Sequence, residues 1–76
     1  MDKEEIEQIM QKIIRMADEF KDYPSTSLAS DLDKEISILR FIIGENNFIS
    51  LHYFRSVHEK VVAYLDGKDK SKSNDA

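Results

Sequence analysis

Apolar residues recur at three- and four-residue steps along most of the chain, which is the spacing of amphipathic helices. The first set lies within residues 2–22 and includes Ile6, Ile13 and Phe20. Pro24 follows, and a proline disfavours helix at the preceding residue and cannot continue the hydrogen-bond ladder. We therefore predict a first helix over residues 2–22.

A second apolar stripe begins after three consecutive hydroxyl residues, Ser25, Thr26 and Ser27, any of which can cap a helix. The stripe consists of Leu28, Leu32, Ile36, Leu39 and Ile43. Gly44 follows it directly, which suits the left-handed conformation that commonly ends a helix. We predict a second helix over residues 27–43.

The second half of this helix is apolar on nearly every side, because Ile38, Phe41 and Ile42 lie outside the stripe. Such a segment has to be covered on more than one face. A position between two other helices would cover it, and so would a dimer interface.

A polar break, Gly44-Glu45-Asn46-Asn47, separates this helix from a third apolar pattern. Ser50 is placed to cap a helix over residues 50–66, and Gly67 is placed to end it. The stripe of this helix is Leu51, Phe54, Val57 or His58, Val61 and Leu65. The short break predicts that the second and third helices form an antiparallel hairpin.

The predicted fold class is all-α: a three-helix antiparallel bundle, or a helical hairpin with the N-terminal helix packed across it. Residues 1–67 form the single domain, and residues 68–76, which lack a large apolar side chain, form a disordered polar tail. A chain of 76 residues with no cysteine builds only a marginal core and has no disulfide to reinforce it. We therefore predict a homodimer in which Ile38, Phe41 or Ile42 is shared between subunits.

The charge distribution narrows the choice of partner. The net charge is −4, which argues against binding to nucleic acid, since that binding needs clustered lysine and arginine. Residues 1–35 carry ten acids and five bases, so this half suits a basic partner surface. No stretch approaches a membrane span or a secretory leader, and we expect a cytoplasmic protein.

Catalytic, cofactor and metal signatures are missing from the sequence. His52 and His58 do not share a helix face, there is no glycine-rich phosphate loop, and no serine stands in a nucleophile-elbow motif. We therefore expect no catalytic residue, no cofactor, no metal and no enzymatic activity. A buried pocket that joins His52 or His58 to an acid would favour an enzyme instead.

A candidate partner surface lies on the third helix, outside or beside its apolar stripe. It consists of side chains that often anchor protein contacts: His52, Tyr53, Arg55, His58 and Tyr64. The alternative is that these residues only border the core and cover it with their apolar portions.

From Pro24 onward the chain resembles the pediocin-like (class IIa) bacteriocin immunity proteins. Over about half of the chain it shows the order of a proline, a helix of the form Leu-x-Ser-x-Leu-x-x-Glu-Ile-Ser at residues 28–37, a short loop, Ser50 and a last amphipathic helix. The resemblance implies a cytosolic antiparallel helical bundle, without enzymatic activity, that protects a producing cell at the bacteriocin's membrane receptor.

Two functions follow from these observations. The first is a small non-enzymatic protein-binding module that acts through the hairpin surface, with bacteriocin immunity as its most concrete form. The second is an acidic regulator or inhibitor, encoded by a phage, a plasmid or the host, that binds a basic site on a target protein.

Overall fold

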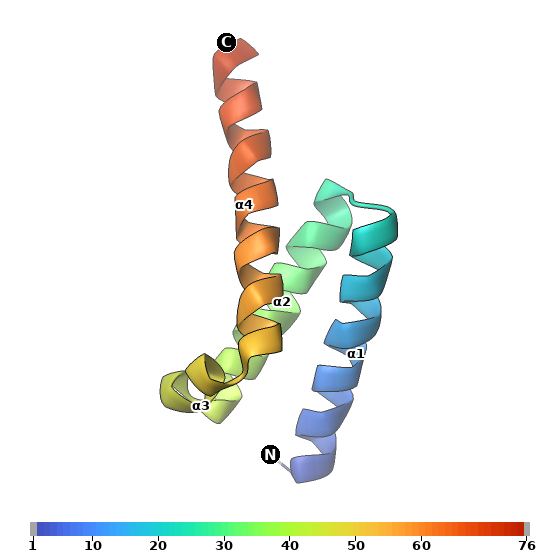
Figure 1. The fold of residues 1–76 in the computed structure, drawn as a ribbon, viewed down its shortest axis with the longest axis vertical. Helices are drawn as coiled ribbons and strands as arrows, with labels where there is room; N and C mark the ends of the chain where they lie inside the picture. The colour runs from blue at the N-terminus through green and yellow to red at the C-terminus, as the bar shows by residue number, and fades with distance from the viewer. Residues whose placement is uncertain (1, 76) are drawn as a thin grey trace.

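The computed structural model describes the backbone of residues 2–75 and the side chains of residues 2–67. The helices of this part of the chain are α1 (Lys3–Asp22), α2 (Thr26–Ile43), α3 (Glu45–Ser50) and α4 (His52–Asp75). α1 and α4 run in the same direction, and α2 runs opposite to both (Figure 1). The helices expected over residues 2–22 and 27–43 are confirmed, each to within one residue of its ends.

The turn between α1 and α2 forms as its local sequence requires. Tyr23 ends α1, and its backbone N–H donates to the carbonyl oxygen of Glu19 at 2.8 Å. Pro24 follows, and Ser25 then caps α2, because its Oγ accepts a hydrogen bond from the N–H of Leu28 at 3.1 Å. Of the three hydroxyl residues that could begin this helix, the first is therefore the cap.

The segment after Gly44 corrects the three-helix prediction. Residues expected to form a polar break are instead the six-residue helix α3, and Ser50 ends that helix rather than beginning the next one. α3 forms because the side chain of Phe48 packs in the core, where it is only 1% exposed. Burial of this one ring, worth about 1.5–3 kcal/mol, fixes a helix whose other residues are mostly polar.

Gly44 joins α2 to α3 and has a positive φ of 91°, as the sequence suggested. Its ψ is 154°, so the backbone is extended rather than in the left-handed helical region. This combination of angles is open essentially to glycine alone. The chain therefore changes direction here without the usual left-handed cap.

α4 is longer than expected. The helix continues past Gly67, where the sequence predicted its end, and reaches Asp75. The side chains of residues 68–76 lie outside the described residues, so the predicted disordered polar tail stays a prediction.

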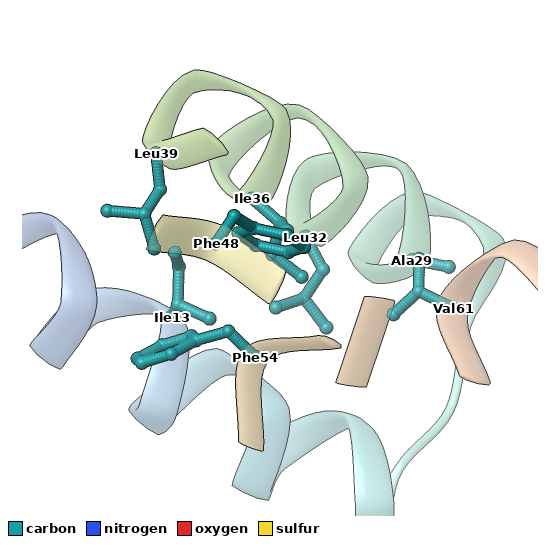
Figure 2. Packing of buried hydrophobic residues seen from close by; sticks show 8 residues of the cluster. All are labelled: Ile13, Ala29, Leu32, Ile36, Leu39, Phe48, Phe54 and Val61. Atoms are coloured by element: carbon teal, nitrogen blue, oxygen red, sulfur yellow. The ribbon is translucent and has the colours of Figure 1, made fainter. Parts of the chain in front are cut away.

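Eight side chains drawn from all four helices form the core (Figure 2). They are Ile13 from α1, Ala29, Leu32, Ile36 and Leu39 from α2, Phe48 from α3, and Phe54 and Val61 from α4. α2 lies at the centre and packs against each of the other three helices. α1 and α4 both rest on α2 and pack more closely on it than on each other. The antiparallel pairing of the two hairpin helices, α2 and α4, is thus confirmed (Figure 1).

Candidate functional site

The residues predicted to bind a partner do not form one continuous surface. Tyr53 and Tyr64 face α1, where both line the same groove. His58 faces α2, Arg55 reaches back to α3, and His52 is exposed at the start of α4. The five side chains therefore point to at least three different sides of the helix.

Arg55 and His58 both hold neighbouring helices in place. Arg55 Nη1 donates to the carbonyl oxygen of Ile49 at 3.2 Å, which satisfies a free backbone acceptor near the end of α3. His58 Nε2 lies 2.9 Å from Asp33 Oδ1 on α2, and its ring meets the edge of Phe48 with centroids 6.2 Å apart. These contacts connect α4 to α2 and α3, so both residues serve the fold.

Arg40 makes a further contact with Phe48. Its guanidinium lies 5.0 Å from the centroid of the Phe48 ring, a cation–π distance. Arg40 Nε also donates to Glu45 Oε1 at 2.6 Å, and a second bond joins Nη2 to Oε2. This paired hydrogen bond lowers the pKa of the Glu45 carboxyl. Phe48 therefore contacts His58 of α4 and Arg40 of α2, and both contacts help to fix α3 against the bundle.

A groove of about 670 Å³ lies between α1 and α4 and is the main hollow apolar surface in the described part of the chain. α1 contributes Ala17, Asp18, Phe20 and Lys21, α4 contributes Tyr53, Val57, Lys60, Ala63 and Tyr64, and Pro24 closes one end. The α4 residues Tyr53, Val57, Lys60 and Tyr64 follow each other at steps of four, three and four, which places them on one helix face.

Aromatic contacts set the shape of the groove. The rings of Phe20 and Tyr64 meet edge to face across the two walls, with centroids 5.2 Å apart. At the other end Tyr53 packs edge to face on Phe54, with centroids 5.3 Å apart, and Phe54 belongs to the core. Ala17 and Ala63 lie between these anchors, and their small side chains leave the space that larger residues would fill.

Charged groups border the apolar lining. Lys21 and Lys60 stand on opposite walls, and Asp18 stands near Tyr53. Among the described residues neither of these lysines forms an ion pair. Burial raises the pKa of Tyr53 above its usual value, and the Asp18 carboxylate raises it further. The Tyr53 hydroxyl therefore stays protonated and available as a hydrogen-bond donor well into alkaline solution.

The residues predicted for self-association form a separate patch on α2. Phe41 is 88% exposed and Ile38 is 39% exposed, whereas Ile42 is half-buried. A phenylalanine ring left almost entirely in water is unfavourable, since burying it would gain about 1.5–3 kcal/mol. The three helices that pack on α2 cover its other faces and leave this one exposed, although α2 lies at the centre of the bundle.

A third surface lies at the turn between α1 and α2. It is an open hollow of about 710 Å³, in which the carboxylates of Glu19, Asp22 and Asp31 surround Tyr23, Pro24 and the start of α2. Tyr23 is 77% exposed. This surface carries part of the acidic excess of the first 35 residues.

Within the described part of the chain, no three His, Cys, Asp or Glu side chains are grouped so that they could hold a metal ion. His58, whose Nε2 lies 2.9 Å from Asp33 Oδ1, borders an open hollow that is also lined by Glu59, Val62, Ala63 and Asp66. Over the same residues no helix combines the length and apolar character that crossing a membrane requires.

Sequence reasoning found Tyr53 and Tyr64 but missed the rest of the groove. Phe20 and Val57 belong to the predicted apolar stripes, and no local pattern distinguishes Lys21 and Lys60 from the other lysines. The regular spacing of Tyr53, Val57, Lys60 and Tyr64 was the available signal, since those four positions define one face that His52 and Arg55 do not share.

Comparisons of the chain with protein-family models, with curated proteins and with solved structures found no match.

Proposed function

We propose that this protein is a small non-enzymatic binding module that docks another protein in the groove between α1 and α4. The observation that carries the proposal is the groove itself, an open apolar surface with a tyrosine near each end. Two lysines stand on its rim, and neither forms an ion pair with another described residue. Tyrosine is enriched at the energetic centres of protein interfaces, because one rigid side chain offers both apolar area and a hydrogen bond.

Bacteriocin immunity is the most concrete form of this proposal, and it rests on the resemblance of residues 24–65 to the pediocin-like immunity proteins. The corresponding test is expression of the chain in cells that a pediocin-like bacteriocin kills. Survival of those cells supports this form, and unchanged killing argues against it.

Homodimer formation through α2 is part of the proposal. It is supported by the exposure of Phe41 beside Ile38, which a second copy of α2 would cover across a two-fold axis. Sedimentation of wild type and Phe41→Ser separates the outcomes: a wild-type dimer that Phe41→Ser converts to a folded monomer supports the proposal, and a wild-type monomer at high micromolar concentration contradicts it.

A second candidate function is that of an acidic regulator that occupies a basic site on its target. The hollow formed by Glu19, Asp22 and Asp31 favours it, because an exposed tyrosine stands among carboxylates there. Binding of this kind weakens steeply as salt concentration rises, whereas docking in the apolar groove depends on salt much less.

The experiment that tests the groove uses two matched variants of α4. Ala63→Arg places a long charged side chain at the edge of the groove, which Ala63 shares with the open hollow beside His58, and it removes no core side chain. Ser56→Arg adds the same charge at an exposed position outside both surfaces. We expect partner capture from cells to be lost with Ala63→Arg and kept with Ser56→Arg, while both variants keep the wild-type circular dichroism spectrum. Equal capture by the two folded variants would show that the groove is not the docking site.

A further inference from the structure

The uncovered face of α2 carries a short apolar patch between two opposite charges. Ile38 and Phe41 form the patch, with exposed fractions of 39% and 88%. Lys34 precedes Ile38 by one turn, and steps of four and three residues place these three side chains on one face of the helix. Glu45 follows Phe41 just beyond the end of α2. The order along this surface is therefore cation, apolar, apolar, anion.

The two charges differ in their local contacts. Lys34 is exposed, and among the described residues it forms no ion pair. The Glu45 carboxylate is bound by Arg40 in the last turn of α2, yet the Glu45 side chain is 54% exposed. Arg40 lowers the pKa of this carboxyl, so Glu45 is ionised at neutral pH. Because the two oxygens of a carboxylate offer about four acceptor positions, Glu45 can bind a second cation beside Arg40.

This order of side chains is complementary to itself in one orientation. A two-fold axis brings the same patch of two subunits together, so the patch has to match its own copy. When two copies of α2 lie antiparallel about the midpoint between Ile38 and Phe41, each Ile38 meets the Phe41 of the other copy. Lys34 and Glu45 lie four positions outside this pair on either side, so each Lys34 meets the Glu45 of the other copy. A parallel pairing would instead place like charges together.

The C-terminal end of α2 favours the same ionic contact. The last carbonyl groups of a helix have no partner within the helix, and that end carries partial negative charge. In the antiparallel pairing the Lys34 side chain of the second copy lies beside this end, where Glu45 adds a full negative charge. The helix dipole and the carboxylate therefore attract the same lysine.

The size of the patch indicates a dimer of modest affinity. A covered aromatic side chain buries about 150–250 Å², so two Phe41 rings supply roughly a quarter of the area of about 1,200–2,000 Å² that stable complexes bury. Ile38 and the other exposed side chains along α2 have to supply the rest. We expect a dissociation constant in the micromolar range, at the weak end for interfaces of this class.

From the self-complementary order of these side chains we infer that α2 pairs with the α2 of a second copy in antiparallel orientation, with Lys34 of each copy bound to Glu45 of the other. This inference rests on the homodimer of the proposed function, and it adds the orientation, the register and the ionic contact that sets both. None of the residues that line the α1–α4 groove belongs to α2, so each copy keeps its groove open to a partner.

Distances between spin labels test the orientation without changing the patch. The chain has no cysteine, so Ser27→Cys provides a single labelling site at an exposed position in the first turn of α2. The two labels of the antiparallel dimer should lie about 38 Å apart, given the helical rise and an interaxial distance of about 9 Å. In a parallel dimer they would lie about 10 Å apart. A long distance by double electron–electron resonance, lost when Phe41→Ser is added, supports the inference, and spectral broadening from labels in close proximity overturns it.

Charge variants test the register. Lys34→Glu turns two attractive contacts into two repulsive ones and should raise the dissociation constant of the dimer about tenfold. Lys3→Glu makes the same change in net charge at an exposed position on α1 and should leave that constant close to wild type. Glu45→Lys should weaken the dimer as Lys34→Glu does, and an equimolar mixture of these two variants should restore it, because opposite charges then meet at both contacts. A Lys34→Glu dimer as tight as wild type, or a mixture as weak as its components, would overturn the register.

Failure of the inference and failure of the proposed function are distinguishable. A wild-type dimer that Phe41→Ser dissociates, but whose labels lie close together or which does not respond to Lys34→Glu, keeps the homodimer and overturns its antiparallel pairing. A wild-type protein that is monomeric at high micromolar concentration contradicts the homodimer and the inference together. The docking of a partner in the groove is decided separately, by the comparison of Ala63→Arg with Ser56→Arg.

Discussion

Replacement of Gly44 by alanine should destabilise the protein through the backbone alone. Gly44 has φ 91° and ψ 154°, a region that residues with a side chain rarely adopt, while a Cβ added there meets no atom within 4 Å. The cost is therefore conformational rather than steric and amounts to about 1–3 kcal/mol. For a domain of this size that lowers Tm by about 4–8 °C for each kcal/mol.

Gly67→Ala is the matched control, because the same chemical change should have the opposite sign there. Gly67 lies inside α4, its φ is not positive, and an added Cβ again meets nothing within 4 Å. Alanine in a helix interior is favoured over glycine by about 0.8–1 kcal/mol. Gly67→Ala should therefore stabilise the protein, and this result would also support the continuation of α4 past that position.

Urea unfolding followed by circular dichroism measures both effects, with the free energy of unfolding obtained from the midpoint and the slope m. Gly44→Ala should shift the midpoint to lower urea and Gly67→Ala to higher urea, both with m unchanged. If Gly44→Ala is as stable as wild type, the positive φ between α2 and α3 is wrong. If Gly67→Ala is destabilised, residue 67 is not inside a helix.

Three further predictions address the packing and the charged groups. Phe48→Ala should lower the free energy of unfolding by about 3–5 kcal/mol, because Phe48 is fully buried. A loss below about 1 kcal/mol, measured by urea unfolding, would show that Phe48 does not anchor α3 to the core. Tyr53 should ionise above pH 10 in an ultraviolet titration. Asp18→Asn should lower the pKa of Tyr53 only part of the way to its ordinary value, because burial is the larger cause of the shift. An ordinary pKa for Tyr53 in the wild type would contradict its position. The pKa of Glu45 is lowered by Arg40, so this pair stabilises the fold above the unfolded-state pKa of Glu45, and the gain is lost as the pH falls through the lower folded-state value. Thermal unfolding curves of wild type and Glu45→Gln should therefore differ at pH 7 and converge at strongly acidic pH, and a constant difference at every pH would refute this origin.

Local signals were sufficient to place α1 and α2. Pro24 prevents helix at Tyr23, Ser25 caps the next helix, and Gly44 supplies the positive φ that ends it. Each of these features acts over a few residues, so the local sequence alone is sufficient to predict where α1 and α2 begin and end. The buried stripe of α2 follows from its three- and four-residue spacing, because that spacing alone decides which side chains share a face.

Tertiary contacts decided what the sequence could not show. α3 consists mostly of polar residues and exists because Phe48 reaches the core, an interaction that depends on the distance between α2 and α4. A lone phenylalanine in a polar segment was the only available signal. The groove likewise depends on the distance between α1 and α4, which no local pattern sets. The contact between His58 and Asp33 also joins two helices, so the sequence alone presents His58 only as a candidate partner residue.

The core and the exposed apolar surfaces are formed by different helices of this small protein. α2 supplies half of the buried core residues and leaves Phe41 exposed, while the apolar groove lies between α1 and α4. The groove residues are carried on helices fixed by the core, so under the proposed function the docking surface would already have its shape before binding. A preformed surface loses less conformational entropy on binding than a flexible one.

Partner capture by the folded variants Ala63→Arg and Ser56→Arg, measured beside wild type, tests the docking site most directly. We predict that capture is lost with Ala63→Arg and kept with Ser56→Arg. Equal capture by the two variants, or loss of capture with Phe41→Ser alone, would contradict the account.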